Sequence, residues 1–295
     1  MSDYSNIIDI AFLNSYGKEK NDFLRLFNNN LFSDVRKWDN FELAEDIPGL
    51  MDNIKVRMKY FMSKLSLGVY NVLDLGPGEN IKDNDEIYLI SGFTEIGTIN
   101  KIGNMIMEND YGINPSLFPN SVHHISLCYY SILKKINNYC TAITDGLNTN
   151  LSFINFIKNR VKIEGDFIIV TGEEKSTFFD YEIKNPLNIV NSFAAYKIIP
   201  DSIKGFSFKG SVKSIDELKQ NDIYKKSKNV FVDKETFLNF KLEGNKNIFC
   251  EYPIIKDNPC GIIFRLAFPF YFDIKGYSIV IEKTDNRYYF FEVNI

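Results

Sequence analysis

Apolar residues along the chain alternate between short continuous runs and longer stretches with helical spacing. Residues 6–13 (NIIDIAFL) form a buried-strand run that ends in a turn at Gly17, and Phe23, Leu26 and Phe27 then mark one face of a helix over 18–30. Similar patterns predict strands at 86–91, 140–144 and 166–171, and helices at 50–73, 94–109, 121–136 and 147–161. Strands that alternate with helices predict an α/β domain with a mainly parallel sheet covered by helices.

The pattern changes near residue 212. Two predicted strands, 193–199 and 203–212, precede a polar, lysine-rich stretch at 213–229. The remainder predicts helices at 234–240 and 261–272 and a terminal hairpin turned by Asp285 and Asn286. We therefore expect a first part at 1–212 and a smaller second part at 213–295 that packs on the same core. The sequence shows no internal repeat.

The composition is that of a globular protein with an aromatic interior. Hydrophobic residues make up 45% of the chain, and the 26 phenylalanines and 17 tyrosines would fill a core or an interface. A net charge of −4 provides no basic surface for phosphates, so nucleic acid is not an expected partner. The chain has neither a signal-peptide pattern nor a run of about 18 apolar residues, and we expect a cytoplasmic protein without a membrane span.

Cysteine and histidine are too few and too scattered for a usual metal site. The four cysteines show no C-x-x-C spacing, and the only histidines are the adjacent pair His123 and His124. Glu173, Glu174 and Asp180 follow a predicted strand, where a run of acids is more typical of a solvated loop than of paired-carboxylate chemistry. We expect no metal and no cofactor.

The segment 111–176 resembles the N-terminal half of the β-ketoacyl synthases. A phenylalanine loop, a helix start, a Ser-Ile pair, a strand, a nucleophile turn, a helix and an apolar strand follow one another in that family's order. The counterparts are Phe118, Ser121 with Val122, His123 and His124, Ser131 with Ile132, the strand 141–144, the turn at Asp145 and Gly146, and Gly172 with Glu173. The resemblance extends over residues 5–212 and is strongest at 115–175.

This resemblance implies a thiolase-like layered fold whose N-terminal half is complete and whose C-terminal half is reduced. The chain is most similar to short ketosynthase-like proteins of aryl polyene and polyketide-type pathways, which assemble acyl chains on acyl carrier protein. The family's reaction is that of 3-oxoacyl-[acyl-carrier-protein] synthase, an acyltransferase. Because residues that condensation needs are missing, the sequence leaves open whether this chain is an enzyme.

Condensation needs a thiol at the tip of a strand-to-helix turn, where the helix N-terminus favours the thiolate. Gly146 occupies that tip, and glycine offers no nucleophile. The family also uses histidines, or a histidine and an asparagine, from its C-terminal half, and no histidine follows His124. The substitute nucleophiles nearest in sequence are Cys140, Thr144 and Asp145; Asp145 is better placed to cap the following helix, and Cys140 precedes the tip by six residues.

The histidine pair and its neighbours suggest a pocket floor or an interface. In the related family this helix start lies near the dimer interface, so the resemblance places Phe118, Ser121, His123 and His124 there, together with Gly146. Adjacent residues on a helix point about 100° apart, so both histidines cannot face one pocket. A structural role at the interface is therefore favoured over acid–base catalysis.

Three functional hypotheses follow. The leading one is a catalytically silent ketosynthase homologue that, like a chain-length factor, pairs with an active ketosynthase or with itself and meets acyl carrier protein. The second is an acyltransferase or thioesterase that acts on acyl thioesters through Cys140, Thr144 or Asp145. The third is an acyl-binding regulatory module without turnover.

Overall fold

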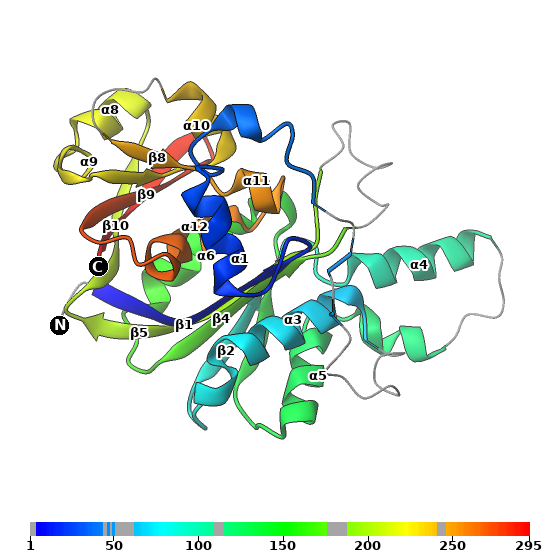
Figure 1. Cartoon of the computed structure of the whole chain (residues 1–295). Helices are drawn as coiled ribbons and strands as arrows, with labels where there is room; N and C mark the ends of the chain where they lie inside the picture. Colours follow the sequence, from blue (N-terminus) through cyan, green and yellow to red (C-terminus); the bar gives the residue numbers. More distant parts are fainter. Residues whose placement is uncertain are drawn as a thin grey trace.

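The chain folds around ten β-strands that form a mixed sheet (Figure 1). The computed structural model describes residues 4–43, 46–47, 49–50, 62–108, 115–175, 188–240 and 246–295. The strands are β1 (Tyr4–Asn14), β2 (Glu86–Ile90), β3 (Cys140–Ile143), β4 (Phe167–Glu173), β5 (Ser192–Ser202), β6 (Gly205–Val212), β7 (Asn229–Phe231), β8 (Asn247–Phe249), β9 (Tyr277–Thr284) and β10 (Arg287–Asn294). Their spatial order is β3-β2-β4-β5-β1-β6-β10-β9-β7-β8.

The two halves of this order have the same topology. In the first half, β3, β2 and β4 run parallel, whereas β5 is antiparallel to both β4 and β1. In the second half, β8, β7 and β9 run parallel, whereas β10 is antiparallel to both β9 and β6. The fold is therefore a duplication that the sequence conceals. The expectation of a reduced C-terminal half is wrong, because all five strands of the second set are present.

The expectation of a mainly parallel sheet is also wrong. Five of the nine strand pairings are antiparallel, including the single-residue pairing of β1 with β6 that joins the two halves. The apolar run of β4 predicted a buried strand correctly, but burial on two faces does not fix the direction of a neighbour. The division proposed at residue 212 lies at the end of β6 and remains a proposal.

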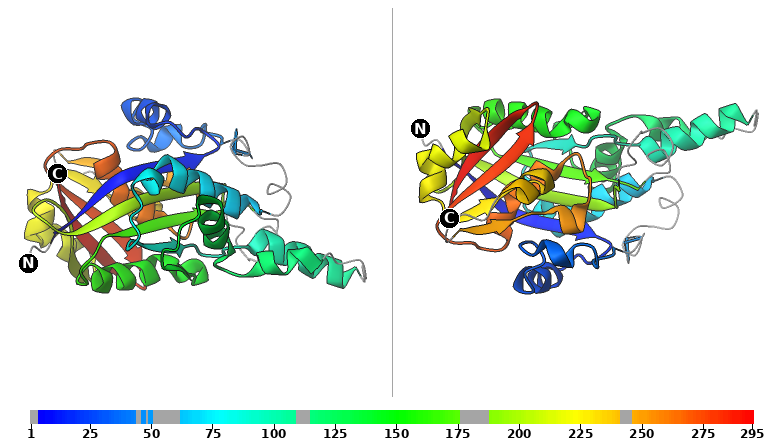
Figure 2. Two further views of the ribbon diagram at one scale, coloured as in Figure 1. Left: turned by 90° about the horizontal axis from the view of Figure 1, so that it is seen from below. Right: turned by 90° about the horizontal axis from the view of Figure 1, so that it is seen from above.

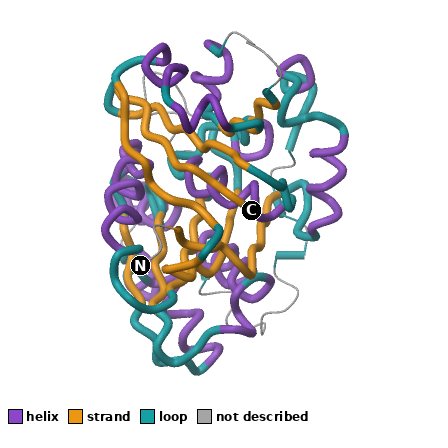
Figure 3. The backbone as a smooth tube through the Cα atoms, turned by 90° about the vertical axis from the view of Figure 1, so that its left-hand side faces the viewer, coloured by secondary structure: helices purple, strands orange, loops and turns teal. Residues whose placement is uncertain are grey.

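Helices form the remaining layers. They are α1 (Lys20–Asn28), α3 (Lys64–Leu75), α4 (Ile96–Met107), α5 (Ile125–Lys134), α6 (Thr149–Arg160), α8 (Ile215–Gln220), α9 (Asp222–Lys226), α10 (Lys234–Asn239), α11 (Tyr252–Ile255) and α12 (Gly261–Tyr271). Figure 3 shows helices on the outer sides of the strands, and Figure 2 shows α4 extending away from the body in two views.

Alternate residues along the strands point into different cores. Ile169 of β4 and Val280 of β9 belong to a central core that also contains α6 and α12. Ile168, the neighbour of Ile169, faces α3 and α5 instead, whereas Ile279 faces α8 and α9. The period of two along a strand thus produces five layers, with α6 and α12 in the middle.

The central helix α12 contains one residue that contradicts its apolar pattern. Arg265 is 1% exposed, and its guanidinium pairs with Glu251 and Glu282 while also donating to the carbonyl oxygen of Ile281 at 2.7 Å. A buried guanidinium is tolerated only when its donors are satisfied in this way. The pair of carboxylates links α12 to β9 and to the segment before α11.

Several predicted elements are confirmed. They include the apolar helix α12, the helix α10 and the terminal hairpin, in which Asp285 and Asn286 adopt φ of 50° and 55°. The predicted helix 121–136 begins later, at Ile125. Part of the predicted helix 50–73 lies outside the described residues, and α3 covers its C-terminal part.

Candidate functional site

The turn after β3 is the strand-to-helix elbow that the sequence predicted. Gly146 lies at its tip with φ of 54°, and its N–H donates to the carbonyl oxygen of Gly92 at 2.9 Å. Thr144 Oγ1 donates to the same oxygen at 2.8 Å. A Cβ built on Gly146 would find only the Phe93 ring within 4 Å, at 3.9 Å. Glycine is therefore favoured here by the backbone conformation and not by lack of space.

Three segments distant in sequence converge beside this elbow. A Cβ on Gly92, which follows β2, would clash with the Pro259 ring and approach the Gly146 oxygen to 2.9 Å. Pro259 precedes α12 in the second half of the chain. The backbone of residue 92 thus sits directly against both the elbow and the start of α12, and only glycine fits.

A buried carboxylate holds the segment after β2. Glu173, fully buried at the end of β4, accepts hydrogen bonds from Ser91 Oγ at 3.0 Å, from the Gly92 N–H, and from the Phe93 N–H at 3.3 Å. The thiol of Cys260, at the N-cap of α12, lies 3.5 Å from Glu173 Oε1. Burial raises the pKa of Glu173 to about 7 against the opposing effect of these donors.

Two further buried carboxylates flank Glu173. Glu174 accepts from the N–H groups of Gly97 at 2.9 Å and Leu65 at 3.1 Å, and burial followed by the nearby charge of Glu95 raises its pKa to about 7. Glu95 accepts from Ser126 Oγ at 2.8 Å, and burial raises its pKa as well. Its Oε2 has no hydrogen-bond partner among the described residues. The predicted solvated acidic loop is therefore wrong for Glu173 and Glu174.

The segment held by these carboxylates is strained at one residue. Thr94 is fully buried with φ of 46°, a conformation that β-branched residues rarely adopt. Its Oγ1 lies 2.6 Å from Nδ1 of His123. Backbone strain that the surroundings maintain is typical of functional segments.

The two histidines precede the helix on which they were predicted. His123 and His124 are both exposed, and His124 is the N-cap residue of α5 without a side-chain capping bond. Because neither histidine lies within a helix, the angle of about 100° between adjacent helical residues does not describe their side chains. Only His123 is connected to the elbow region, through Thr94.

The proposed substitute nucleophiles are poorly placed. Cys140 lies at the start of β3, at the opposite end of the strand from the elbow, and burial raises the pKa of its thiol. The carboxylate of exposed Asp145 accepts from Ser152 Oγ at 2.6 Å and makes no capping bond. Asp145 is, as predicted, the N-cap residue of the helical turn Gly146–Asn148 that leads into α6, although its side chain does not cap it.

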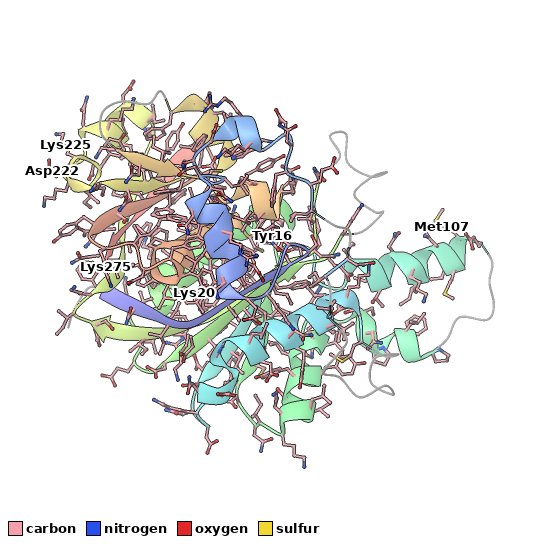
Figure 4. All side chains as sticks on the ribbon, viewed as in Figure 1. Tyr16, Lys20, Met107, Asp222, Lys225 and Lys275 are labelled. Carbon is pink, nitrogen blue, oxygen red and sulfur yellow. The ribbon has the colours of Figure 1, made fainter. Side chains whose placement is uncertain are left out.

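Phe118 and Ser121 lie at the surface near α4 and α5. Phe118 is 50% exposed, and Ser121 Oγ donates to its carbonyl oxygen at 2.8 Å. Figure 4 labels Met107, 82% exposed, at the far end of α4. Both Phe118 and Met107 belong to a group of exposed apolar side chains between residues 99 and 147. The others are Ile99, Ile106, Val122, Ile132, Tyr139 and Leu147.

The chemistry available at the elbow is limited. Glu173 can exchange a proton near neutral pH, but burial and the charge of Glu173 raise the pKa of the adjacent Cys260 thiol and oppose thiolate formation.

Within the described residues, no group of three or more metal-ligating side chains is arranged to hold an ion. No described helix is long and apolar enough to cross a bilayer.

No family model and no curated protein matches the sequence. Solved structures match across the whole chain. "The ishigamide ketosynthase/chain length factor" gives a TM-score of 0.71 at 9% identity, covering 99% of this chain and 100% of that one. A ketosynthase in complex with its chain length factor from Xenorhabdus doucetiae gives 0.62 at 10% identity, covering 98% of each chain.

A third match is a type II polyketide synthase acyl-carrier protein in complex with its ketosynthase bound to the hexaketide. It gives a TM-score of 0.65 at 11% identity and covers 100% of both chains. The chain therefore has the thiolase-like fold seen in ketosynthases and chain length factors. The full-length coverage agrees with the complete second half.

Proposed function

We propose that this protein is a non-condensing ketosynthase homologue that acts as the chain-length-factor-like partner of an active ketosynthase in polyketide-type acyl chain assembly. The observation that carries the proposal is the retained elbow with Gly146 at its tip. The backbone that would present a nucleophile is preserved, whereas the nucleophile is absent. Similar structures include ketosynthase complexes with a chain length factor and with acyl carrier protein, which supports the same partners here.

The electrophilic partners of condensation are missing as well. No histidine occurs beyond residue 124, so the second half supplies no imidazole to stabilise an enolate or an oxyanion. Near the elbow the second half supplies Pro259 and Cys260 instead. Loss of the nucleophile together with these groups removes the interactions that provide most of the rate enhancement.

The exposed apolar surface supports a protein partner. Among the described residues, eight of the 15 exposed large hydrophobic side chains lie between residues 99 and 147, a range that includes α4, α5 and β3. β3 is the first strand in the sheet order and has one open edge among the described residues. An open edge beside apolar side chains favours sheet extension by a second chain.

The two alternative functions have weaker support. An acyltransferase or thioesterase would need Cys140, Thr144 or Asp145 as its nucleophile, but Thr144 donates to Gly92, Asp145 accepts from Ser152, and Cys140 lies at the far end of β3. An acyl-binding module would need only the fold. It would bind acyl thioesters without any ketosynthase partner.

Complex formation through the β3 edge provides the test. The carbonyl oxygens of Tyr139 and Ile143 bond to β2, so by alternation the N–H of Ala142 faces the open edge. Ala142→Pro would remove this donor, whereas Ala142→Val would keep it. We expect native mass spectrometry to show a complex with a type II ketosynthase for the parent chain and Ala142→Val, and its loss for Ala142→Pro. A parent chain that stays monomeric with every ketosynthase tested would refute the proposal.

A further inference from the structure

A cavity of about 690 Å³ has a lining that does not include Gly92, Gly146 or Pro259. Its walls come from the segment after α1, from α10 and α11, and from residues beside β4 and β5; Figure 1 shows α10 and α11 beside that first segment. Trp38, Val190 and Tyr252 form apolar parts of the wall, and Lys175, Lys234 and Lys256 supply ammonium groups. The volume is in the range of small-molecule sites.

Two of these lysines have no carboxylate partner within the described part of the chain. Lys234 Nζ lies 3.6 Å from the centroid of the Tyr252 ring, and Lys256 Nζ lies 5.7 Å from it and donates to the carbonyl oxygen of Phe41 at 3.2 Å. Among the residues that the structure describes, neither ammonium forms an ion pair. Two ammonium groups without an ion-pair contact to any described carboxylate therefore lie near one aromatic ring at the cavity wall.

Lys256 is unusual both in its backbone conformation and in the charges that surround its ammonium group. Its φ of 49° and ψ of −138° lie in a region that residues other than glycine rarely occupy. Burial lowers the pKa of Lys256, and the charge of Lys234 lowers it further, against smaller opposing effects from Asp257, Asp39 and Glu42. The fold thus maintains strain and charge repulsion to hold an ammonium at this wall.

We propose that this cavity binds a phosphorylated small molecule whose phosphate lies between Lys234 and Lys256. A phosphate dianion would neutralise both ammonium groups, which is the compensation that the described residues do not supply. Asp39 and Glu42 also line the cavity, but among the described residues neither forms an ion pair with Lys234 or Lys256. The wall of Trp38 and Tyr252 would receive an apolar or aromatic portion of the ligand. This site goes beyond the proposed function and does not depend on it.

Calorimetric titration of the full chain at fixed ionic strength tests the site, with inorganic phosphate and phenyl phosphate as probes. We expect saturable binding of one molecule per chain, tighter for phenyl phosphate, and about tenfold weaker in Lys234→Gln and Lys256→Gln because each loses one charge-assisted contact. Lys225→Gln is the matched control. Lys225 lies at the outer surface next to Asp222, as labelled in Figure 4.

A second readout separates the site from weak ionic attraction and from misfolding. Amine-directed labelling followed by mass spectrometry should show that phenyl phosphate protects Lys234 and Lys256 but leaves Lys225 labelled. Lys256→Arg should retain binding if the charge is what matters. Equal binding in all variants, absence of saturable binding to the parent chain, or no difference in protection between these lysines would overturn the proposal.

Discussion

The two halves of the molecule share one topology, but the buried carboxylates Glu173 and Glu174 of the first half and Glu251 and Glu282 of the second have different partners. In the second half, Glu251 and Glu282 both pair with a buried guanidinium, Arg265. In the first half, the donors to Glu173 and Glu174 among the described residues are backbone N–H groups and neutral side chains, and burial raises the pKa of both to about 7. Burial also raises the pKa of Glu282, to about 8, against the opposing effect of Arg265. The two halves therefore differ in the partners of these carboxylates and not in the direction of their pKa shifts.

The largest expected effect is on the ion pairs of the second half. Arg265→Met would leave two buried carboxylates without their cation, and we expect a loss of about 3–5 kcal/mol in the free energy of unfolding. Arg265→Lys keeps a charge but not the two-sided geometry and should lose less. Urea unfolding measures both variants. Equal stability of Arg265→Met and the parent chain would contradict the structural role assigned to this cluster.

The titrating carboxylates of the first half predict a pH dependence. The folded pKa of Glu173, about 7, exceeds its unfolded value, so the folded state binds the extra proton between roughly pH 4.5 and 7. Stability should therefore decrease as pH rises through this window, by about 3 kcal/mol for this carboxyl.

Glu173→Gln removes this titrating group and should reduce the slope of the profile between roughly pH 4.5 and 7. Glu95, Glu174 and Cys260 face the same region, and the two carboxyls should leave a residual slope in the variant. The measurement is chemical unfolding at several pH values. Identical slopes for the variant and the parent chain would show that Glu173 does not titrate in this range.

Gly92 tests the contact between the halves. Gly92→Ala would press a methyl group against Pro259 and the Gly146 carbonyl, and we expect a loss of about 1–3 kcal/mol. A methyl group on Gly103, in α4, would meet no described atom within 4 Å, so Gly103→Ala should stabilise by about 0.5–1 kcal/mol through helix propensity. Thermal unfolding of the two variants should shift in opposite directions.

The smallest expected effect is at the elbow itself. Gly146→Ala meets only Phe93 at 3.9 Å, so its cost should be limited to the left-handed backbone, about 1 kcal/mol. The comparison with Gly92→Ala then separates backbone strain from a steric clash. A loss as large as that of Gly92→Ala would show that the elbow is tightly packed.

The sequence predicts the fold best where local chemistry decides the structure. The terminal hairpin follows from Asp285 and Asn286, which tolerate positive φ, and α12 follows from its continuous apolar run. β7 and β8 were missed because three residues are too few to show a period of two. Without β7 and β8, the predicted second half has fewer strands than the first, which is why we expected it to be reduced.

Two missed helices did carry a readable signal. Ser214 accepts from the N–H of Glu217 at the start of α8, and Asn221 accepts from the N–H of Ile223 at the start of α9. These caps stand inside the lysine-rich stretch, whose polarity suggested a loop.

The elbow could be placed from the sequence, whereas its carboxylates could not. Glu173 bonds to donors about 80 residues away, and nothing local distinguishes it from a solvated acid. The same holds for Cys260, which reaches Glu173 from 87 residues further along the chain. Tertiary contacts of this length are set by the sheet order, which the hydrophobic pattern does not encode.

The most direct test of the proposed silent role is mass spectrometry of the purified chain after incubation with acyl carrier protein thioesters, alone and with a type II ketosynthase. The account predicts a complex with the ketosynthase and no acyl adduct on this chain, because Gly146 leaves the elbow without a nucleophile. Stoichiometric acylation of this chain at a defined residue would contradict it and would establish an enzyme.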